Sequence, residues 1–262
     1  MQSKIQSTRC YWAGAAAGLV ALAFAGSVQA QLLTVPNSSF ESQSGLGQPF
    51  NVNINIDSWQ KAGRPSYFPA TGYNGFFWVQ TAGVFNAPAY GNQVGDQAAF
   101  ILSFPQAGIF QDFDTRDWND ATPTHEFNAL YEVGKSYKLT VGLYGKSMLE
   151  NYSSLELSLY YRDGFNAIVP VGSTTVVFNS ATFNASGPFN LVDFEVNVPF
   201  VQPTDDWAGQ NIGIKIASVL GDGNGYWDLD NVRLEAVPEP ATFALLGLGL
   251  SGWLLARWKH RR

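Results

Sequence analysis

Short runs in which apolar and polar residues alternate recur along the chain, and they limit its fold more than any other feature. The clearest runs occupy residues 100–104, 138–143, 155–161, 192–198 and 211–216. Successive side chains of a strand point to opposite faces, so this period of two predicts strands with one buried and one polar face. Turn-forming Gly, Pro, Asp and Asn residues separate the runs, and no helical period is convincing. The pattern predicts an all-β fold, an antiparallel β-sandwich of the jelly-roll type.

The composition agrees with a folded domain and disfavours one class of partner. Charged residues make up 14% of the 262 residues and aromatic residues 15%. Disordered chains show the opposite balance. Residues 31–236 hold nine Lys plus Arg and twenty Asp plus Glu, a balance of −11. Because such an acidic surface repels phosphates, we expect no nucleic-acid partner.

Cysteine and histidine are almost missing from this acidic middle. The one cysteine is Cys10, and the one histidine before the C-terminal tail is His125. Disulfides and cysteine-type metal sites are therefore excluded there, and any metal must take oxygen ligands, which means calcium or magnesium. The middle contains no GxSxG, P-loop or GxGxxG motif. With no catalytic motif, we expect a protein that is not an enzyme.

The first 30 residues are typical of a secretory signal peptide. Lys4 and Arg9 precede an Ala-rich apolar run over residues 13–25, and Val28-Gln29-Ala30 places small residues before a cleavage site. The apolar run is too short to span a bilayer of roughly 30 Å, although an uncleaved N-terminal anchor is the alternative. We expect export, with residue 31 as the first of the mature chain.

The last 26 residues combine three features in a fixed order. Pro238-Glu239-Pro240 is followed by an apolar run over residues 241–256 and by a basic cluster over residues 257–262. The run predicts a short transmembrane helix at about 241–256, and the basic end would stay in the cytoplasm. This tail resembles the PEP-CTERM sorting signal of Gram-negative bacteria. The resemblance implies an exosortase as processing partner, an intermediate anchored in the inner membrane, and a final place at the cell surface or in an extracellular polysaccharide matrix such as a biofilm. A tail that remains uncut as an anchor is the alternative.

The middle resembles a second family, the galactose-binding-like jelly rolls. The resemblance rests on the opening Val35–Glu41, on Gly108–Asp112 and Val133–Thr140 as inner strands, and on the closing strand Trp227–Leu234. Many carbohydrate-binding modules share this fold, which therefore implies a sugar ligand without showing it. The domain organisation that we predict is a signal peptide at 1–30, a β-sandwich at 31–236 and a sorting tail at 237–262.

Two carboxylates are candidates for a structural calcium site. In the family that the middle resembles, a carboxylate after the opening Phe and the Asp before Asn-Val often ligate calcium, and these positions are Glu41 and Asp230. Asp230 has the same parity as Val232 and Leu234, so it should point inward, where an unpaired carboxylate is costly. Calcium would neutralise it. Backbone hydrogen bonds without a metal are the alternative.

Residues 59–90 are dense in aromatic side chains, interleaved with Arg, Asn and Gln. Sugar rings stack on aromatic planes while amides and guanidinium groups bind their hydroxyls, so this segment is a candidate carbohydrate site. We expect Tyr67, Tyr73 and Trp78 to be exposed and to contact the sugar. Trp59 and Phe77 are expected in the core. The alternative is that most of these rings fill the core or hold a long loop in place.

Two acidic stretches could carry chemistry but are better explained otherwise. Asp112, Asp114, Asp117, Asp120 and Glu126 are interpreted as a solvated loop rather than as paired carboxylates of a glycosidase. Asp222, Asn224 and Asp228 are interpreted as part of an exposed turn.

Taken together, these features favour an exported, non-catalytic protein that binds extracellular polysaccharide. Two other classes stay open: a polysaccharide hydrolase or lyase on a jelly roll, and a purely structural matrix protein. The sequence names neither the glycan nor the oligomeric state.

Overall fold

The computed structural model describes residues 29–42, 52–73, 75–115, 127–145, 148–185 and 190–238. Residues 31–236 form one compact unit. The apolar runs over 13–25 and 241–256 lie outside the described residues. Within the described ranges, no helix is long and apolar enough to cross a membrane.

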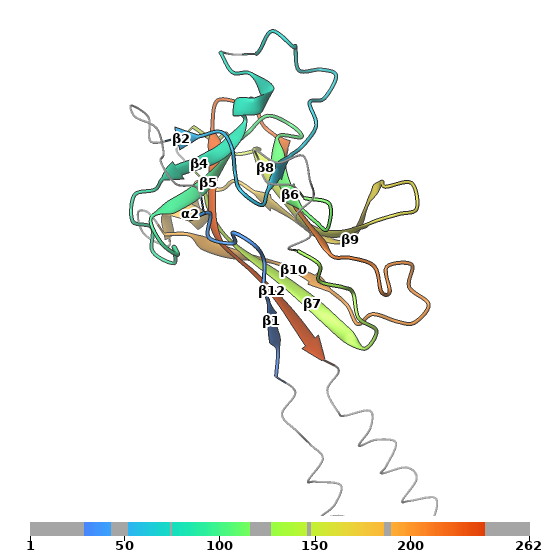
Figure 1. Cartoon of the computed structure of the whole chain (residues 1–262). Helices are drawn as coiled ribbons and strands as arrows, with labels where there is room; N and C mark the ends of the chain where they lie inside the picture. Colours follow the sequence, from blue (N-terminus) through green and yellow to red (C-terminus); the bar gives the residue numbers. More distant parts are fainter. Residues whose placement is uncertain are drawn as a thin grey trace, which may run out of the picture. The chain divides into compact units, whose positions relative to one another are not determined.

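Antiparallel strands in two sheets make up this unit (Figure 1), which confirms the predicted all-β sandwich. The larger sheet has the order β10-β7-β12-β5-β4-β2, and β1 pairs with the distal part of β12. Its strands are β1 (Gln31–Leu33), β2 (Val52–Asn53), β4 (Ala82–Asn86), β5 (Gln97–Leu102), β7 (Lys135–Gly145), β10 (Val192–Val198) and β12 (Tyr226–Pro238). The smaller sheet has the order β3-β6-β11-β8-β9, formed by β3 (Gln60–Lys61), β6 (Gly108–Gln111), β8 (Ser154–Arg162), β9 (Ile168–Val177) and β11 (Gly213–Leu220).

The apolar positions of the alternating runs form the core between the sheets. Leu139, Val141 and Leu143 of β7 are fully buried, as are the alternate residues of β8 and β11. Burying a side chain of this size stabilises the fold by roughly 1.5–3 kcal/mol, which is why the alternation locates the strands so well.

Two short helical segments are not expected from the sequence. The 3-10 helix η1 covers Trp78–Gln80, and α2 covers Ser180–Ala185. The side-chain oxygen of Asn179 accepts a hydrogen bond of 2.9 Å from the backbone N–H of Ala181, which satisfies a donor at the start of α2. Phe183 is 1% exposed and attaches α2 to the core. One turn of helix is too short to show a period of 3.6 residues in the sequence.

Candidate functional site

A buried tyrosine and a buried aspartate form the most unusual polar contact of the larger sheet. Tyr90 lies in the loop 87–96 between β4 and β5, and Asp228 lies on β12. The hydroxyl of Tyr90 donates a hydrogen bond to Oδ2 of Asp228. Tyr90 is 5% exposed and Asp228 is fully buried. The two residues, called the Tyr90–Asp228 pair below, are thus removed from bulk water.

The loop that carries Tyr90 is fixed across the sheet by its backbone. The carbonyl of Gly91 accepts a hydrogen bond of 3.0 Å from the N–H of Leu191, just before β10. A Cβ atom at Gly91 would lie 1.8 Å from Oδ1 of Asn190, so any larger residue there would force the side chain of Asn190 to move. Asn231 of β12 donates to the carbonyl of Asn92, at 3.1 Å. Contacts with both neighbouring segments therefore determine where Tyr90 points.

Aromatic rings surround the pair. The ring of Tyr144 on β7 lies 5.4 Å from that of Tyr90, and Phe183 of α2 lies 6.4 Å from Tyr144. Phe183 also contacts Trp227, at 5.8 Å. Tyr144 and Tyr226 are half-buried, so solvent reaches this aromatic surrounding on one side.

The environment of Tyr90 keeps its proton on the phenol. Burial raises the pKa of Tyr90 far above its usual range, and the charge of Asp228 and the hydrogen bond between them add to this effect. A phenol that stays neutral next to a carboxylate can donate a hydrogen bond to it at any physiological pH. The pair is chemically suited to exchange one proton with a third group placed against it.

Glu41 and Asp230 come close to each other at the same loop. The backbone N–H of Val94 donates to Oδ2 of Asp230 at 2.7 Å, and that of Gln97 donates to Oε1 of Glu41 at 2.6 Å. A Cβ atom at Gly95 would lie 2.4 Å from the Glu41 carboxyl group, so glycine is needed there. Burial, and to a smaller extent the charge of Glu41, raises the pKa of Asp230 to about 7, although backbone hydrogen bonds from Val94 and Asn231 act in the opposite direction.

The burial of Asp230 is confirmed, but the parity argument behind it is wrong. Asp228 and Asp230 alternate with Trp227 and Leu229, which belong to the core. Both carboxylates therefore point to the other face of the sheet. Asn231 has a φ of 55°, and after it the buried positions change phase to Val232, Leu234 and Ala236. Val94 and Glu41, rather than the sandwich core, surround Asp230.

Three of the five predicted positions of the aromatic segment are correct. Tyr67 and Tyr73 are 49% and 48% exposed, and Trp59 is buried in the core. Trp78 is 8% exposed, which contradicts the expectation of an exposed ring, because η1 turns it inward where its Nε1 donates to the carbonyl of Ala62 at 2.7 Å. Phe77 is 53% exposed, which contradicts the expectation that it lies in the core.

The two acidic stretches also differ from their interpretation. Asp112 is 4% exposed and accepts hydrogen bonds from Tyr160 and Arg162, so it is no part of a solvated loop. Asp117, Asp120 and Glu126 lie outside the described residues. Asp222 and Asn224 form an exposed turn as predicted, whereas Asp228 belongs to β12 and is buried.

No group of three or more His, Cys, Asp or Glu side chains comes together for a metal ion in the part of the chain that the structure describes. A cation between Glu41 and Asp230 would thus need backbone or amide oxygens as further ligands.

Of the sorting motif, Pro238 ends β12, while Glu239 and Pro240 lie outside the described residues.

The sequence and the fold match known proteins in both parts of the chain. Residues 31–235 match the family model of the HpiC1 cyclase, and residues 236–262 match the PEP-CTERM protein-sorting motif. The motif marks an exported protein that an exosortase processes. No curated protein matches the sequence.

Solved structures of cyclases from Fischerella share the fold. The apo form of one is 20% identical, with a TM-score of 0.55 over 81% of this chain and 98% of its own. The Stig cyclase Fisc, in complex with (3Z)-3-(1-methyl-2-pyrrolidinylidene)-3H-indole, is 20% identical with a TM-score of 0.54, over 80% and 99%. A carbohydrate-binding module, CBM4, reaches a TM-score of 0.40 at 11% identity, over 79% of this chain and 100% of its own.

The family match corrects one expectation from the sequence. The lack of a known catalytic motif led to the expectation of a protein that is not an enzyme, whereas the family and its structural neighbours are cyclases. A buried pair such as Tyr90 and Asp228 escapes motif searches because its members lie 138 residues apart. Over residues 31–235 the chain belongs to the HpiC1 cyclase family, and the PEP-CTERM motif follows at residues 236–262.

Proposed function

We propose that this protein is an exported cyclase-type enzyme that closes a ring in a substrate bound against the Tyr90–Asp228 pair. The observation that carries the proposal is the pair itself: a carboxylate and a neutral phenol, both buried, joined by a hydrogen bond and surrounded by aromatic rings.

The pair would act by moving a proton. Ring closure by addition across a double bond needs a proton donor and an acceptor, and positioned side chains in these roles typically accelerate a reaction 10²–10⁴-fold. In the buried surrounding of Asp228 the electrostatic interactions are stronger than in water. Such a reaction rearranges bonds without gain or loss of atoms, so substrate and product are isomers.

The rings around the pair suggest which substrates fit. Aromatic faces attract a cation within about 6 Å, so they would stabilise positive charge that develops after protonation. Tyr144 and Tyr226, which solvent reaches, would form the entrance. Two of the Fischerella structures are complexes with indole-containing compounds, which supports an apolar substrate with an aromatic part.

Binding of 4-(1H-indol-3-yl)butan-2-one, measured by calorimetry on the full chain, tests the place of this site. Tyr144→Ala should weaken binding about tenfold because it removes the ring beside Tyr90. Tyr152→Ala is the matched control, since Tyr152 is 54% exposed in the turn before β8. Equal affinities for the two variants, or no binding by the unchanged protein, would contradict the proposed site.

Glu41 and Asp230 form a separate proposal, a structural calcium site next to the catalytic pair. Oδ1 of Asp230 is buried without a hydrogen bond among the described residues, and the two carboxylates repel each other. Both facts fit a cation as the missing partner. Calcium there would hold the loop 87–96 on β12 and would supply charge neutralisation.

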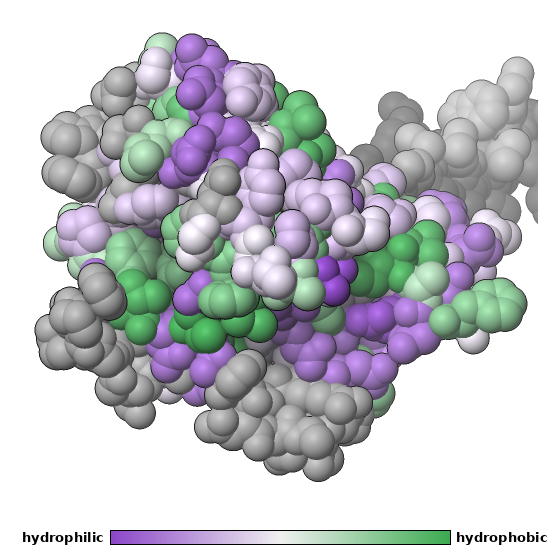
Figure 2. Space-filling model, turned by 90° about the horizontal axis from the view of Figure 1, so that it is seen from above, coloured by the Kyte–Doolittle hydropathy of each residue, from purple (hydrophilic) through white to green (hydrophobic). Residues whose placement is uncertain are grey.

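Carbohydrate contact remains a further proposal, carried by Tyr67 and Tyr73. Both lie in the segment between β3 and η1, and about half of each side chain is exposed. Seen from above in Figure 2, this face has several separate apolar clusters between strongly hydrophilic residues, a mixture that suits the apolar faces and hydroxyls of a sugar chain. An extracellular polysaccharide would then keep the exported enzyme in the matrix, at the surface of a Gram-negative cell, after the exosortase has released it from the inner membrane.

A further inference from the structure

A pocket, distant in the chain from Tyr90 and Asp228, lies at the end of the smaller sheet. Its volume is about 110 Å³, and it is open to solvent. Its polar walls come from the segment after β6, the end of β8 with the turn that follows it, and the segment before β11. The residues that carry the argument are Asp112, Tyr160, Arg162, Asn166, Gln210 and Asn211.

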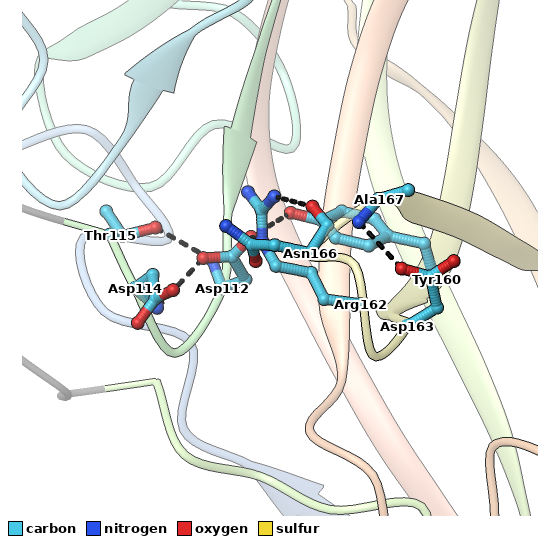
Figure 3. A network of polar contacts seen from close by, with 8 residues as sticks. All are labelled: Asp112, Asp114, Thr115, Tyr160, Arg162, Asp163, Asn166 and Ala167. Carbon is cyan, nitrogen blue, oxygen red and sulfur yellow. Dashed lines mark hydrogen bonds and ion pairs between the residues drawn. The ribbon is translucent and has the colours of Figure 1, made fainter.

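One wall of the pocket is held rigid by a network around Asp112 (Figure 3). Oδ2 of Asp112 accepts hydrogen bonds from the hydroxyl of Tyr160 at 2.5 Å and from Nε of Arg162 at 2.7 Å. Oδ1 accepts from the N–H of Asp114 at 2.9 Å. A Cβ atom at Gly213 would lie 2.3 Å from the ring of Tyr160, so glycine allows this ring its place. The donors and acceptors of the wall are thus fixed before any ligand arrives.

The guanidinium group of Arg162 lines the pocket and is held by three contacts. Its Nε binds Asp112, its Nη1 donates to the carbonyl of Asn166 at 3.0 Å, and the group lies over the ring of Phe110 at 5.6 Å. The side chain of Arg162 is 25% exposed and lines the pocket, so a ligand can contact its guanidinium group.

Three amide side chains complete the polar lining of the pocket, and its net negative charge disfavours anionic ligands. Asn166, Gln210 and Asn211 each offer both a donor and an acceptor. Asp112 and Asp114 outnumber Arg162, which leaves one negative charge in excess. Anionic ligands are therefore disfavoured, whereas a neutral ligand with many hydroxyl groups matches the mixture of donors and acceptors.

The turn beside the pocket presents an aromatic ring to solvent. Phe165 directly precedes Asn166 and is 94% exposed. The carboxylate of Asp163 accepts hydrogen bonds of 2.9 Å from the N–H groups of Phe165 and Ala167, which fixes the turn. The ring of Phe165 is thus available to a ligand that extends from the pocket beyond Asn166.

We propose that this pocket binds a neutral sugar unit, either a free sugar or the end of a sugar chain, with Arg162 and the three amides bonding its hydroxyls and Phe165 packing on its apolar face. The site is separate from the Tyr90–Asp228 pair and from Tyr67, which contacts Pro105 before β6, whereas Asp112 follows β6. The inference does not depend on the proposed cyclase activity.

Calorimetry on the full chain in mild detergent tests the proposal. The probes are galactose, glucose and mannose, their neutral tetrasaccharides, and a galacturonic acid tetrasaccharide. At least one neutral sugar should bind, and the uronic acid chain should bind more weakly. Binding of the monosaccharide as tightly as of its tetrasaccharide assigns the pocket to a single unit, and tighter binding of the tetrasaccharide assigns it to a chain end.

Variants locate the binding. Gln210→Ala with Asn211→Ala should weaken it roughly tenfold, because each lost hydrogen bond typically costs a factor of several. Phe165→Ala should weaken it without lowering the melting temperature. The affinity for the sugar should stay unchanged in two control variants, Gln202→Ala and Tyr152→Ala, whose side chains are exposed outside the pocket. It should also stay unchanged in the double variant Tyr67→Ala with Tyr73→Ala. The proposal is overturned if no neutral sugar binds, if the uronic acid chain binds best, or if the pocket variants bind like their controls.

Discussion

Asp228 and Asp230 lie two residues apart on β12 and face the same side, yet they meet different partners. Asp228 accepts the hydroxyl of Tyr90, whereas Asp230 accepts a backbone N–H and lies near a second carboxylate. The first arrangement keeps a proton available, and the second leaves excess negative charge. One strand thus supports two kinds of chemistry because the loop 87–96 presents a different group to each residue.

The stability of the protein should depend on pH and calcium through Asp230. Its pKa rises from 3.8 to about 7 in the folded state. When a chelator removes calcium, the contribution of Asp230 to the free energy of unfolding is therefore fully present below about pH 4, and it is lost as the pH rises through about 7. Calcium at ten times its dissociation constant should add about 1.4 kcal/mol at pH 8, and Asp230→Asn should abolish that gain. Melting curves at pH 5 and pH 8 that respond neither to calcium nor to chelator would exclude the metal.

Substitution of an exposed ring and of a buried ring should have different effects on stability and on sugar binding. Trp78→Ala removes a buried side chain and should cost about 3–5 kcal/mol of folding free energy. Tyr67→Ala, at an exposed ring, should cost less than about 1 kcal/mol and instead weaken retention on a polysaccharide gel. Urea unfolding and affinity electrophoresis on the same samples measure both. Similar losses of stability for the two variants would show that Tyr67 also serves the core.

At the scale of the element, β12 can place Asp228 and Asp230 outside the sandwich core because its alternation is interrupted. Trp227 and Leu229 face the core before Asn231, and Val232 and Leu234 face it afterwards. A strand without this interruption would bury either Trp227 with Leu229 or Val232 with Leu234 in the core, but not all four. The positive φ of Asn231 is therefore a condition for the arrangement of the two carboxylates.

Substitutions at Asn231 should show the cost of this backbone conformation. A β-branched residue at a positive φ is strained, whereas glycine adopts it freely. Asn231→Val should therefore destabilise the protein by about 1–2 kcal/mol more than Asn231→Gly, and both variants lose the same hydrogen bonds to Asn92. Chemical denaturation gives the two free energies. If the Asn231→Val variant is as stable as the Asn231→Gly variant, the positive φ of Asn231 is not what shifts the core-facing positions of β12.

Elements were more predictable from the sequence than the contacts between them. Leu139, Val141 and Leu143 show their strand through alternation alone, because burial acts on every second residue. Trp78 was misplaced because three residues of 3-10 helix rotate a side chain without leaving a periodic signal. Tyr90 and Asp228 could not be paired, since 138 residues separate them and only the topology of the sheet brings them together.

For the whole molecule, the chain joins a cyclase-family domain to a sorting tail. Residues 31–236 carry the acidic balance of −11, whereas the rest of the chain holds six Lys plus Arg and one Glu, a balance of +5. The acidic part of the chain is thus the cyclase-family domain, and the PEP-CTERM motif that follows it marks the protein as exported.

Processing of the tail should depend on Pro238, Glu239 and Pro240. Changing all three to Ala in a host that has an exosortase should leave the protein larger and bound to the membrane, because the protease no longer recognises its signal. Intact mass and cell fractionation report the outcome. A variant that matures to the same mass as the unchanged protein would count against recognition through these residues.

The account stands or falls on whether the Tyr90–Asp228 pair closes rings, and exact mass measures this directly. Ring closure without loss of atoms converts a compound into an isomer, so incubation with a metabolite extract of the source cells should deplete one chromatographic peak and produce another of identical exact mass. We expect this conversion with the unchanged protein, a loss of at least about a hundredfold in rate with Asp228→Asn, and a smaller loss with Tyr90→Phe. Conversion by Asp228→Asn at the rate of the unchanged protein, or no isomer from the unchanged protein, would contradict the assignment.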